Sequence, residues 1–236
     1  MRIVLRIQRF DPEAGRQPFD ADYSLDVQPT DRILDALIRV KDEQDGSLSY
    51  RRSCAHGVCG SDAMIIGGKE RLACKTLVQE VAAGEGAVVT VQPLRWLPVQ
   101  RDLMVDHGAF FQKFRSMKPF LINEEPVESR ERIQSPEDRS AFDETTSCIL
   151  CGACYSSCPV LESKALYVGP AALVQAARFI FDSRDRGLPQ RLGVLDSADG
   201  VWACDNHFNC TRVCPREIKI TKTINATKRL LTKGKA

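Results

Sequence analysis

The feature that most restricts what this chain can fold into is a run of four cysteines within twelve residues. The run reads CILCGACYSSCP and extends from Cys148 to Pro159. Two, two and three residues separate its cysteines, and a proline follows the last one. Cysteines spaced in this way on a loop can direct their thiolates at a common centre, as a metal site requires. The run therefore predicts a metal centre.

A second run near the C-terminus repeats this spacing, with His207 in place of one cysteine: CDNHFNCTRVCP, from Cys204 to Pro215. The spacing is typical of bacterial ferredoxins, in which the fourth cysteine of each run binds the other cluster. Exchanging the fourth cysteines gives one site with four thiolates and one with three. We therefore expect a 4Fe–4S cluster at Cys148, Cys151, Cys154 and Cys214, and a 3Fe–4S cluster at Cys158, Cys204 and Cys210.

Three alternatives to this assignment concern His207 and the nature of the metal. An imidazole at His207 could hold a fourth iron, although its ring nitrogen lies farther from the backbone than a cysteine sulfur does. Separate zinc sites are a second alternative, which the repetition of the same four-ligand pattern in both runs disfavours. Disulfides are a third, and they fit poorly with cysteines only two or three residues apart in a chain without a secretory signal.

A third group of potential ligands lies in RRSCAHGVCGSDAM. Cys54, Cys59 and Asp62 have the spacing of the first three ligands of a plant-type 2Fe–2S ferredoxin, and Cys74 stands where the distant fourth ligand is expected. Asp62 replaces the usual third cysteine. A carboxylate can bind iron as a harder ligand than a thiolate. We expect Asp62 to be a ligand; the alternative is a solvated loop acid.

Residues beside these ligands are expected to support the loop. Gly57 and Gly60 would let backbone N–H groups approach the sulfurs. The four ligands are complete without His56, which is expected to lie behind them or at the surface. His107 lacks metal-binding spacing and is expected to be structural. Arg51 and Arg52 could offset cluster charge or face a partner.

The first 97 residues are predicted to form a small mixed sheet with one helix. Apolar residues alternate over residues 2–8 and 19–27, and the turn-rich residues 11–18 between them predict a hairpin. A helix is expected after Thr30 as N-cap, with Ile33, Leu34, Leu37 and Ile38 facing the core. Val88, Val89 and Val91 predict a closing strand.

Residues 98–236 are predicted to form an all-α domain with cysteine loops between its helices. The segment PLRWLPVQRD, with two prolines, is expected to be a linker. Another predicted helix of this domain starts at Pro170 and is expected to end at Gly187. The helix before it, directly after the linker, is predicted by apolar residues at helical spacing: Phe110, Phe111, Phe114 and Met117.

Composition excludes several functional classes. The formal net charge of +2 is too small to indicate nucleic-acid binding. No apolar run approaches the roughly 18 residues of a membrane helix, and the N-terminus lacks the features of a signal or transit peptide. Any membrane contact is thus expected through another subunit. No nucleophile triad, paired-acid site or phosphate loop is evident, so the chain is expected to carry electrons between partners and to hold no complete substrate site.

The order of these motifs resembles the iron–sulfur subunit of succinate dehydrogenase and fumarate reductase over nearly the whole chain. Further stretches that carry the resemblance are LACKT, FRSMKPFL and GPAALVQAARFIFDSRD. The resemblance implies an α+β architecture: a β-grasp plant-type 2Fe–2S ferredoxin domain at residues 1–97, then an all-α bacterial-ferredoxin-like domain with two clusters at residues 98–236. Aspartate at the third 2Fe–2S position is similar to what several members carry.

The family implies that succinate is oxidised at FAD in a flavoprotein subunit, from which electrons pass through 2Fe–2S, 4Fe–4S and 3Fe–4S centres to a membrane quinone. This is a step of the tricarboxylic acid cycle and the respiratory chain. Implied partners are the flavoprotein, the quinone, and cytochrome b-type anchor subunits that can hold haem b. The implied location is peripheral, on the cytoplasmic face of a prokaryotic inner membrane. The quinone is expected near Pro159 and His207.

Two departures from the family pattern leave the quinone and anchor types open. No tryptophan follows Cys158–Pro159, and Asp205 stands where many members have a histidine. The direction of the reaction is also open, so a fumarate reductase subunit working in reverse is the main alternative. Two further alternatives are the electron-transfer subunit of another flavoenzyme complex and a freestanding ferredoxin.

Overall fold

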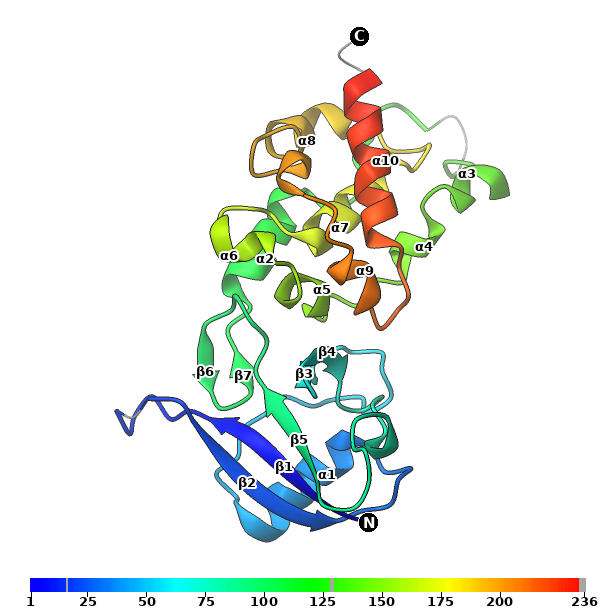
Figure 1. The fold of residues 1–236 in the computed structure, drawn as a ribbon. Helices are drawn as coiled ribbons and strands as arrows, with labels where there is room; N and C mark the ends of the chain where they lie inside the picture. Colours follow the sequence, from blue (N-terminus) through cyan, green and yellow to red (C-terminus); the bar gives the residue numbers. More distant parts are fainter. Residues whose placement is uncertain (16, 128–129, 234–236) are drawn as a thin grey trace. The chain divides into compact units, whose positions relative to one another are not determined.

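The computed structural model describes residues 1–15, 17–127 and 130–233, and its helices and strands are labelled in Figure 1. The chain divides into two compact units. The first unit contains Met1–His107 and Ile149–Ser157. The second contains Gly108–Cys148 and the chain from Cys158 onward. A mixed sheet followed by helices confirms the predicted α+β class.

The sheet of the first unit has five strands in the order β2-β1-β5-β3-β4. Strands β1 and β2 are antiparallel, with Ile3 opposite Leu25 and Leu5 opposite Tyr23, as the alternating pattern predicts. Strand β5 runs parallel to β1, and β3 and β4 form a hairpin. The strands span Arg2–Arg9 (β1), Phe19–Asp26 (β2), Ala63–Ile66 (β3), Lys69–Leu72 (β4) and Ala87–Gln92 (β5). Residue 16, in the predicted turn, lies outside the described residues.

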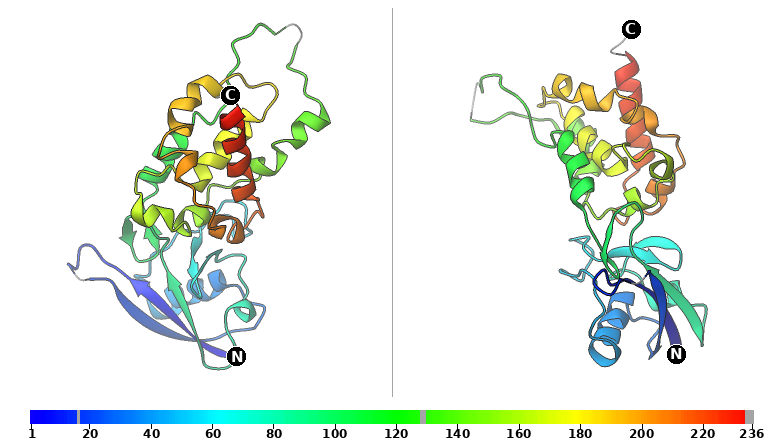
Figure 2. Two further views of the ribbon diagram at one scale, coloured as in Figure 1. Left: turned by 45° about the horizontal axis from the view of Figure 1, so that its top comes forward. Right: turned by 90° about the vertical axis from the view of Figure 1, so that its left-hand side faces the viewer.

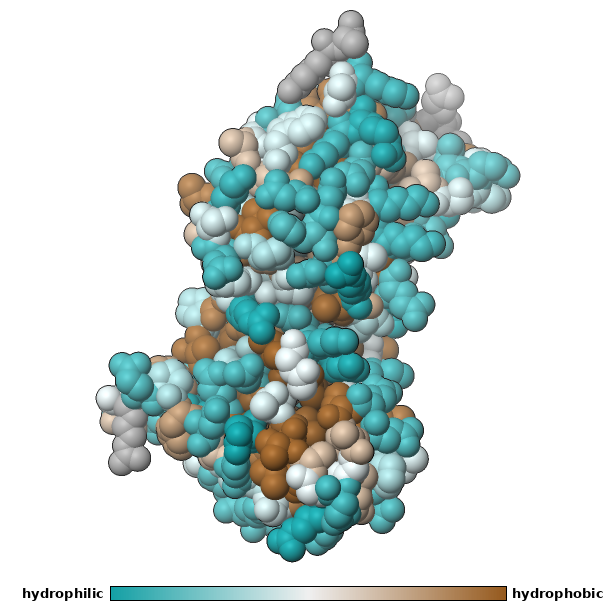
Figure 3. Space-filling view, viewed as in Figure 1, coloured by the Kyte–Doolittle hydropathy of each residue, from teal (hydrophilic) through white to brown (hydrophobic). Residues whose placement is uncertain are grey.

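Helix α1, Ile33–Arg39, covers one face of this sheet (Figures 1 and 2). Its N-cap is Arg32, so the predicted cap at Thr30 is wrong. The backbone N–H of Arg32 donates to the carboxylate of Asp35 at 3.1 Å. This capping bond places the start of the helix two residues after the predicted one. On the opposite sheet face Val88 is 48% exposed, and Figure 3 shows apolar atoms over β5.

The predicted linker is packed onto the first unit. Leu94 and Leu97 are buried, and the segment continues into a two-stranded ribbon of β6, Val99–Arg101, and β7, Met104–Val105. The buried carboxylate of Asp102 accepts hydrogen bonds from the Arg9 guanidinium and from the backbone N–H groups of Phe10 and Ser49. These bonds explain why the first unit extends beyond residue 97 to His107.

The described residues of the second unit form helices joined by loops, without strands. Helix α7 has eight consecutive buried residues and packs against α10 (Figures 1 and 2). It ends at Ile180, so the expected end at Gly187 is wrong; Gly187 instead precedes α8. The principal helices are α2 (Gly108–Ser116), α7 (Pro170–Ile180), α8 (Leu188–Leu195) and α10 (Ile220–Lys233). Short helices are α3 (Pro136–Ser140), α4 (Asp143–Thr146), α6 (Val160–Ser163) and α9 (Asn209–Arg212), whereas α5 (Ala153–Ser156) belongs to the first unit.

A buried ion pair fixes the turn between α7 and α8. The guanidinium of Arg191 donates to Asp185 at 2.7 Å, and both side chains are at most 1% exposed. Arg191 also donates to the backbone carbonyls of Met117, Lys118 and Phe120. Both charges are therefore satisfied inside the unit, as burial of an ion pair requires. Among the described residues, no helix combines the length and the apolar character needed to cross a bilayer.

Candidate iron–sulfur sites

The loop between the π-helical turn η1, Val40–Gln44, and β3 wraps backbone N–H groups around the sulfur of Cys54. The N–H groups of His56, Val58 and Cys59 point at Cys54 Sγ from 3.5, 3.4 and 3.3 Å. These donors lower the pKa of Cys54 to about 6, which favours the thiolate that a metal binds. A positive φ of 83° at Gly57 is one of the backbone turns that make this approach possible.

Asp62 and Cys74 face each other at the buried side of this loop. One carboxylate oxygen of Asp62 accepts the backbone N–H of Cys74 at 2.6 Å. The other oxygen, Oδ1, is buried without a hydrogen-bond partner in the described part of the chain. Burial, followed by the hydrogen bond and charge of Asp62, raises the pKa of Cys74 to about 12. A buried carboxylate oxygen without a partner is costly unless a cation binds it, so Asp62 suits an iron ligand.

Electrostatic and hydrogen-bond contacts connect all four donors of the predicted 2Fe–2S site. Cys54 interacts with Cys59 and with Cys74, and Cys74 interacts with Asp62. The exposed Cys59 sulfur lies 3.1 Å from the hydroxyl of Ser61, a contact that the spacing did not predict. The described geometry therefore brings Cys54, Cys59, Asp62 and Cys74 together.

The two glycines of the loop leave no room for a side chain. A Cβ at Gly60 would lie 2.6 Å from the Cβ of Cys151, and one at Gly57 would lie 2.8 Å from the side chain of Lys75. His56 is exposed, and its ring Nδ1 hydrogen-bonds to the carbonyl of Cys54. Arg51 donates to Gln100, which ties the start of the loop to the β6–β7 ribbon.

The two cysteine runs have the same backbone conformation. In the first run, Leu150 and Gly152 have positive φ angles of 53° and 80°. The equivalent residues of the second run, Asn206 and Phe208, have φ angles of 58° and 63°. The second run keeps this left-handed pattern although Phe208 replaces a glycine. His207 thus stands at the loop position that Cys151 has in the first run.

Each run ends in a Cys–Pro turn that directs backbone N–H groups at the sulfur of its last cysteine. The N–H groups of Val160 and Leu161 point at Cys158, and those of three residues, Arg216–Ile218, point at Cys214. Proline suits this turn because it has no N–H group of its own. N–H donors of this kind stabilise negative charge on cluster sulfurs.

The two units contribute two each of the four predicted 4Fe–4S ligands. Cys148 and Cys214 lie in the second unit, where the charge of Cys148 acts on Cys214. Burial is the main cause of the raised pKa of Cys214. Cys151 and Cys154 lie in the first unit. The grouping of these four residues at one cluster stays a prediction.

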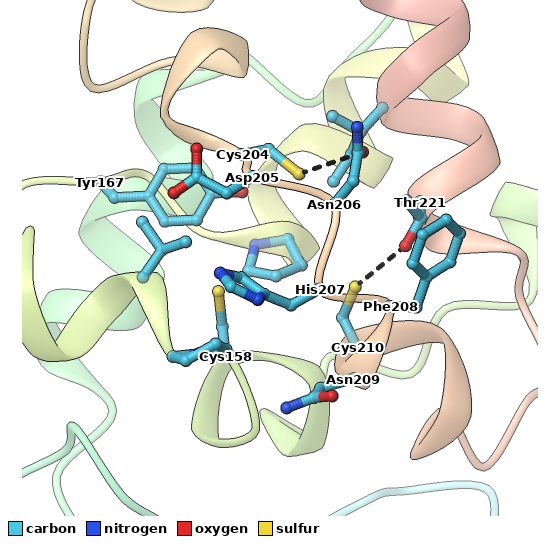
Figure 4. A pocket seen from close by; sticks show the side chains of 14 residues that line it. Cys158, Tyr167, Cys204, Asp205, Asn206, His207, Phe208, Asn209, Cys210 and Thr221 are labelled. Carbon is cyan, nitrogen blue, oxygen red and sulfur yellow. Dashed lines mark hydrogen bonds between the residues drawn. The ribbon is translucent and has the colours of Figure 1, made fainter.

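The three predicted 3Fe–4S ligands line one pocket of the second unit (Figure 4). Burial, with smaller contributions from the nearby Cys210 and Cys204, raises the pKa of Cys158 to about 11. Burial also raises the pKa of Cys210. Cys158 comes from the first run and the other two from the second, which is the exchange of fourth cysteines that the spacing predicts.

Polar groups near these three sulfurs were not predictable from the cysteine spacing. The hydroxyl of Thr221 lies 3.6 Å from Cys210 Sγ, and the side-chain oxygen of Asn206 lies 3.8 Å from Cys204 Sγ. The ammonium group of Lys228 donates to the carbonyl oxygen of Cys204 at 2.7 Å. Thr221 and Lys228 lie on α10, so only the packing of this helix reveals them.

His207 and Pro159 also line this pocket. His207 is exposed, and Figure 4 shows its ring directed into the pocket that Cys158 lines. Large apolar side chains of the same unit are exposed, including Leu166 at 76%, Phe208 at 49% and Trp202 at 40%.

His107, in the first unit, has a pKa lowered mainly by burial and then by Arg51, in keeping with a structural role.

The donor set fits iron–sulfur clusters. All ten cysteines are free thiols, so disulfides are absent. In the described residues no three His, Cys, Asp or Glu side chains are placed to hold a single metal ion. A cluster distributes its ligands over several iron atoms, so its thiolates lie farther apart than those around one zinc ion. Converging thiolates with N–H donors and one orphaned carboxylate oxygen are the chemistry that such clusters require.

Two family models match this chain. A 2Fe-2S iron-sulfur cluster binding domain matches residues 4–112, and a 4Fe-4S dicluster domain matches residues 144–218. The first match covers the sheet and the loop that carries Cys54, Cys59 and Asp62. The second covers both cysteine runs.

Curated relatives and a solved structure resemble the chain over nearly its whole length. It is 39% identical to the fumarate reductase iron-sulfur subunit of Mycobacterium tuberculosis, with 98% of this chain and 96% of that protein covered. It is 39% identical to the succinate dehydrogenase iron-sulfur subunit of Coxiella burnetii, with 94% of each covered. A chain of the Mycobacterium smegmatis Sdh1 complex in the apo form superimposes with a TM-score of 0.88 at 30% identity, covering 99% of this chain and 97% of that one.

Proposed function

Because this chain belongs to the family of iron–sulfur subunits of succinate dehydrogenases and fumarate reductases, we propose that it relays single electrons between a flavin and a membrane quinone. The pocket that Cys158 shares with Cys204 and Cys210 is the observation that carries this proposal. It supports a third cluster beyond the 2Fe–2S and 4Fe–4S centres that the family models describe. Three centres suit a donor of two electrons, such as a flavin, whose electrons must leave singly.

The proposal assigns every one of the ten cysteines to a cluster. The 2Fe–2S cluster is held by Cys54, Cys59, Asp62 and Cys74. The 4Fe–4S cluster is held by Cys148, Cys151, Cys154 and Cys214. The 3Fe–4S cluster is held by Cys158, Cys204 and Cys210.

The residues of this chain hold and tune the clusters, and the clusters supply one-electron transfer when bound. Backbone N–H groups at Cys54, Cys158 and Cys214 stabilise negative charge on these sulfurs. Burial of Cys158 and Cys210 keeps water from their sulfurs. The local dielectric constant is therefore low, which strengthens the hydrogen bonds that these two sulfurs accept. His207 and Pro159 face the same pocket and are proposed to lie near the quinone.

The proposed partners are a flavoprotein subunit with FAD, anchor subunits of the cytochrome b type, with or without haem b, and the quinone. The chain is then a peripheral subunit on the cytoplasmic face of the inner membrane, held there by the anchor. Exposed Leu166, Trp202 and Phe208 support contact with apolar partner surfaces. Oxidation of succinate is the proposed direction. The relative from M. tuberculosis carries the name of a fumarate reductase subunit, which favours the reverse reaction as the second candidate.

Cys210→Ser and Cys54→Ser in the purified complex form a matched test. Cys210→Ser should abolish the 3Fe–4S electron paramagnetic resonance (EPR) signal and quinone reduction, whereas reduction of a dye by the flavoprotein should partly survive. Cys54→Ser should abolish the 2Fe–2S signal and leave the 3Fe–4S signal. Analysis of non-haem iron in the unaltered complex should give nine irons per chain, from clusters of two, four and three.

Unaffected quinone reduction in Cys210→Ser would contradict the placement of this cluster at the electron exit. Ten irons per chain in the unaltered protein would contradict the three-iron assignment and indicate a fourth iron beside His207. Redox titration of the three centres, with the quinone identified, would separate succinate oxidation from fumarate reduction.

A further inference from the structure

Two threonines form a hydrogen-bonded chain that ends on the sulfur of Cys210. Thr221 Oγ1 lies 3.6 Å from Cys210 Sγ and 3.1 Å from Thr211 Oγ1. The backbone N–H of Thr221 donates to Thr211 Oγ1 at 3.0 Å. Thr221 is 1% exposed and Cys210 is 7% exposed, so bulk water competes little for these groups. Figure 4 shows the contact between Thr221 and Cys210.

Binding of iron to Cys210 fixes the direction of every bond in this chain. A thiol can donate or accept, but an iron-bound thiolate has no proton and can only accept. The Thr221 hydroxyl must therefore donate to Cys210 Sγ. Its oxygen can then accept the hydroxyl proton of Thr211, whose own oxygen already accepts the backbone N–H of Thr221. The side chain and the backbone N–H of Thr211 also hydrogen-bond to the sulfur of Cys210, so Thr211 supports this sulfur both directly and through Thr221.

We propose that Thr221, oriented by Thr211, is a positioning residue that raises the reduction potential of the cluster bound by Cys210. This inference rests on the proposed function. Reduction adds one electron, supplied by the flavoprotein, to the cluster, and both hydroxyl groups keep their protons. A hydrogen bond to a ligand sulfur stabilises the more negative reduced form more than the oxidised form, which raises the potential.

The bond from Thr221 can be removed without altering the backbone, unlike the N–H donors around Cys158. Thr221→Val has nearly the same shape and lacks the hydroxyl, whereas Thr221→Ser keeps it. Thr227→Val is the matched control, because Thr227 is also buried on α10 and its hydroxyl bonds to the carbonyl of Thr223 at 3.2 Å.

The test is a redox titration of the 3Fe–4S EPR signal in the purified complex. Thr221→Val should shift the ratio of reduced to oxidised cluster about tenfold toward oxidised, which for one electron is a fall of about 59 mV in potential. Thr221→Ser and Thr227→Val should keep the potential of the unaltered complex.

An unchanged potential in Thr221→Val, with the cluster present, would overturn the inference. An equal fall in Thr227→Val would overturn it as well, because the effect would then come from loosening α10. If Thr221→Val does not assemble, Thr211→Val gives the answer: it removes a hydroxyl that bonds to Thr221 and to Cys210, so it should also lower the potential, and no change would refute the inference. Absence of any 3Fe–4S signal from the unaltered complex would instead overturn the proposed function.

Discussion

Phe208 has a left-handed backbone conformation that bulky side chains rarely adopt. Such a conformation costs of order 1–3 kcal/mol and persists only where the surrounding structure requires it. The equivalent residue of the first run is Gly152, for which the same conformation is unstrained. The second run therefore keeps this backbone at an energetic cost, although His207 stands where the first run has Cys151.

The shared backbone predicts the outcome of His207→Cys. The new thiolate would stand at the position that Cys151 has in the first run, where it can bind the fourth corner of a cluster. The iron content should rise from nine to ten per chain, and the EPR signal of the oxidised 3Fe–4S cluster should disappear. His207→Ser, which adds no thiolate, should keep nine irons and the signal. Nine irons in His207→Cys would show that the two loops are not equivalent in ligand direction.

At the residue scale, the cysteine spacing predicts candidate ligands but gives no sign of the groups that bond to them. Thr221, Asn206 and Ser61 contact ligand sulfurs, yet they have no spacing of their own that marks them. A hydroxyl–sulfur contact depends on where a helix or loop packs. Thr221 reaches Cys210 only because α10 returns past the second run, which no local pattern encodes.

At the scale of elements, periodicity predicted the buried elements well. Strands β1, β2 and β5 and helices α2 and α7 lie where their apolar patterns indicate. Element ends were less predictable, because they depend on single hydrogen bonds such as the one between Arg32 and Asp35. The two prolines of residues 93–102 predict a linker, but burial of Leu94 and Leu97 attaches this segment to the first unit.

A polar network connects β1, β2 and the loop before the first cluster ligands, and it predicts a pH-dependent stability. The carboxylate of Asp45 accepts from Ser47, from Tyr23 at 2.7 Å and from Arg9. These donors, with the Ser47 hydroxyl contributing most, lower the pKa of Asp45 well below its ordinary value. A lowered carboxyl pKa adds stability above the ordinary pKa of about 3.9, and this stability is lost as the pH falls through the folded-state value.

Asp45→Asn should therefore reduce the free energy of unfolding at pH 7 by about 1–3 kcal/mol. The difference from the unaltered protein should shrink as the pH is lowered below about 4, where Asp45 of the unfolded chain begins to be protonated while the folded protein still keeps the carboxylate ionised. Thermal unfolding midpoints at pH 7 and pH 3 would measure this, with the exposed Asp20→Asn as the control. A difference that stays constant between the two pH values would contradict the role of the charge.

At the scale of the whole molecule, the chain belongs to a family of subunits of larger complexes, so its activity is expected to depend on other subunits. A tagged chain, purified from detergent-solubilised membranes, should bring with it a flavin-containing subunit and apolar anchor subunits. Flavin and non-haem iron should be present at one flavin per nine irons. A freestanding ferredoxin would be recovered alone and without flavin, and that result would exclude the proposed role as a subunit.

The common backbone of the two cysteine runs has a consequence for evolution. Loop shape and metal count are specified by different residues, so mutation of a single codon could change the nuclearity of the terminal centre while the scaffold stays as it is. A lineage that adopts another respiratory electron acceptor could in this way change the type of its terminal cluster while the surrounding protein structure stays the same.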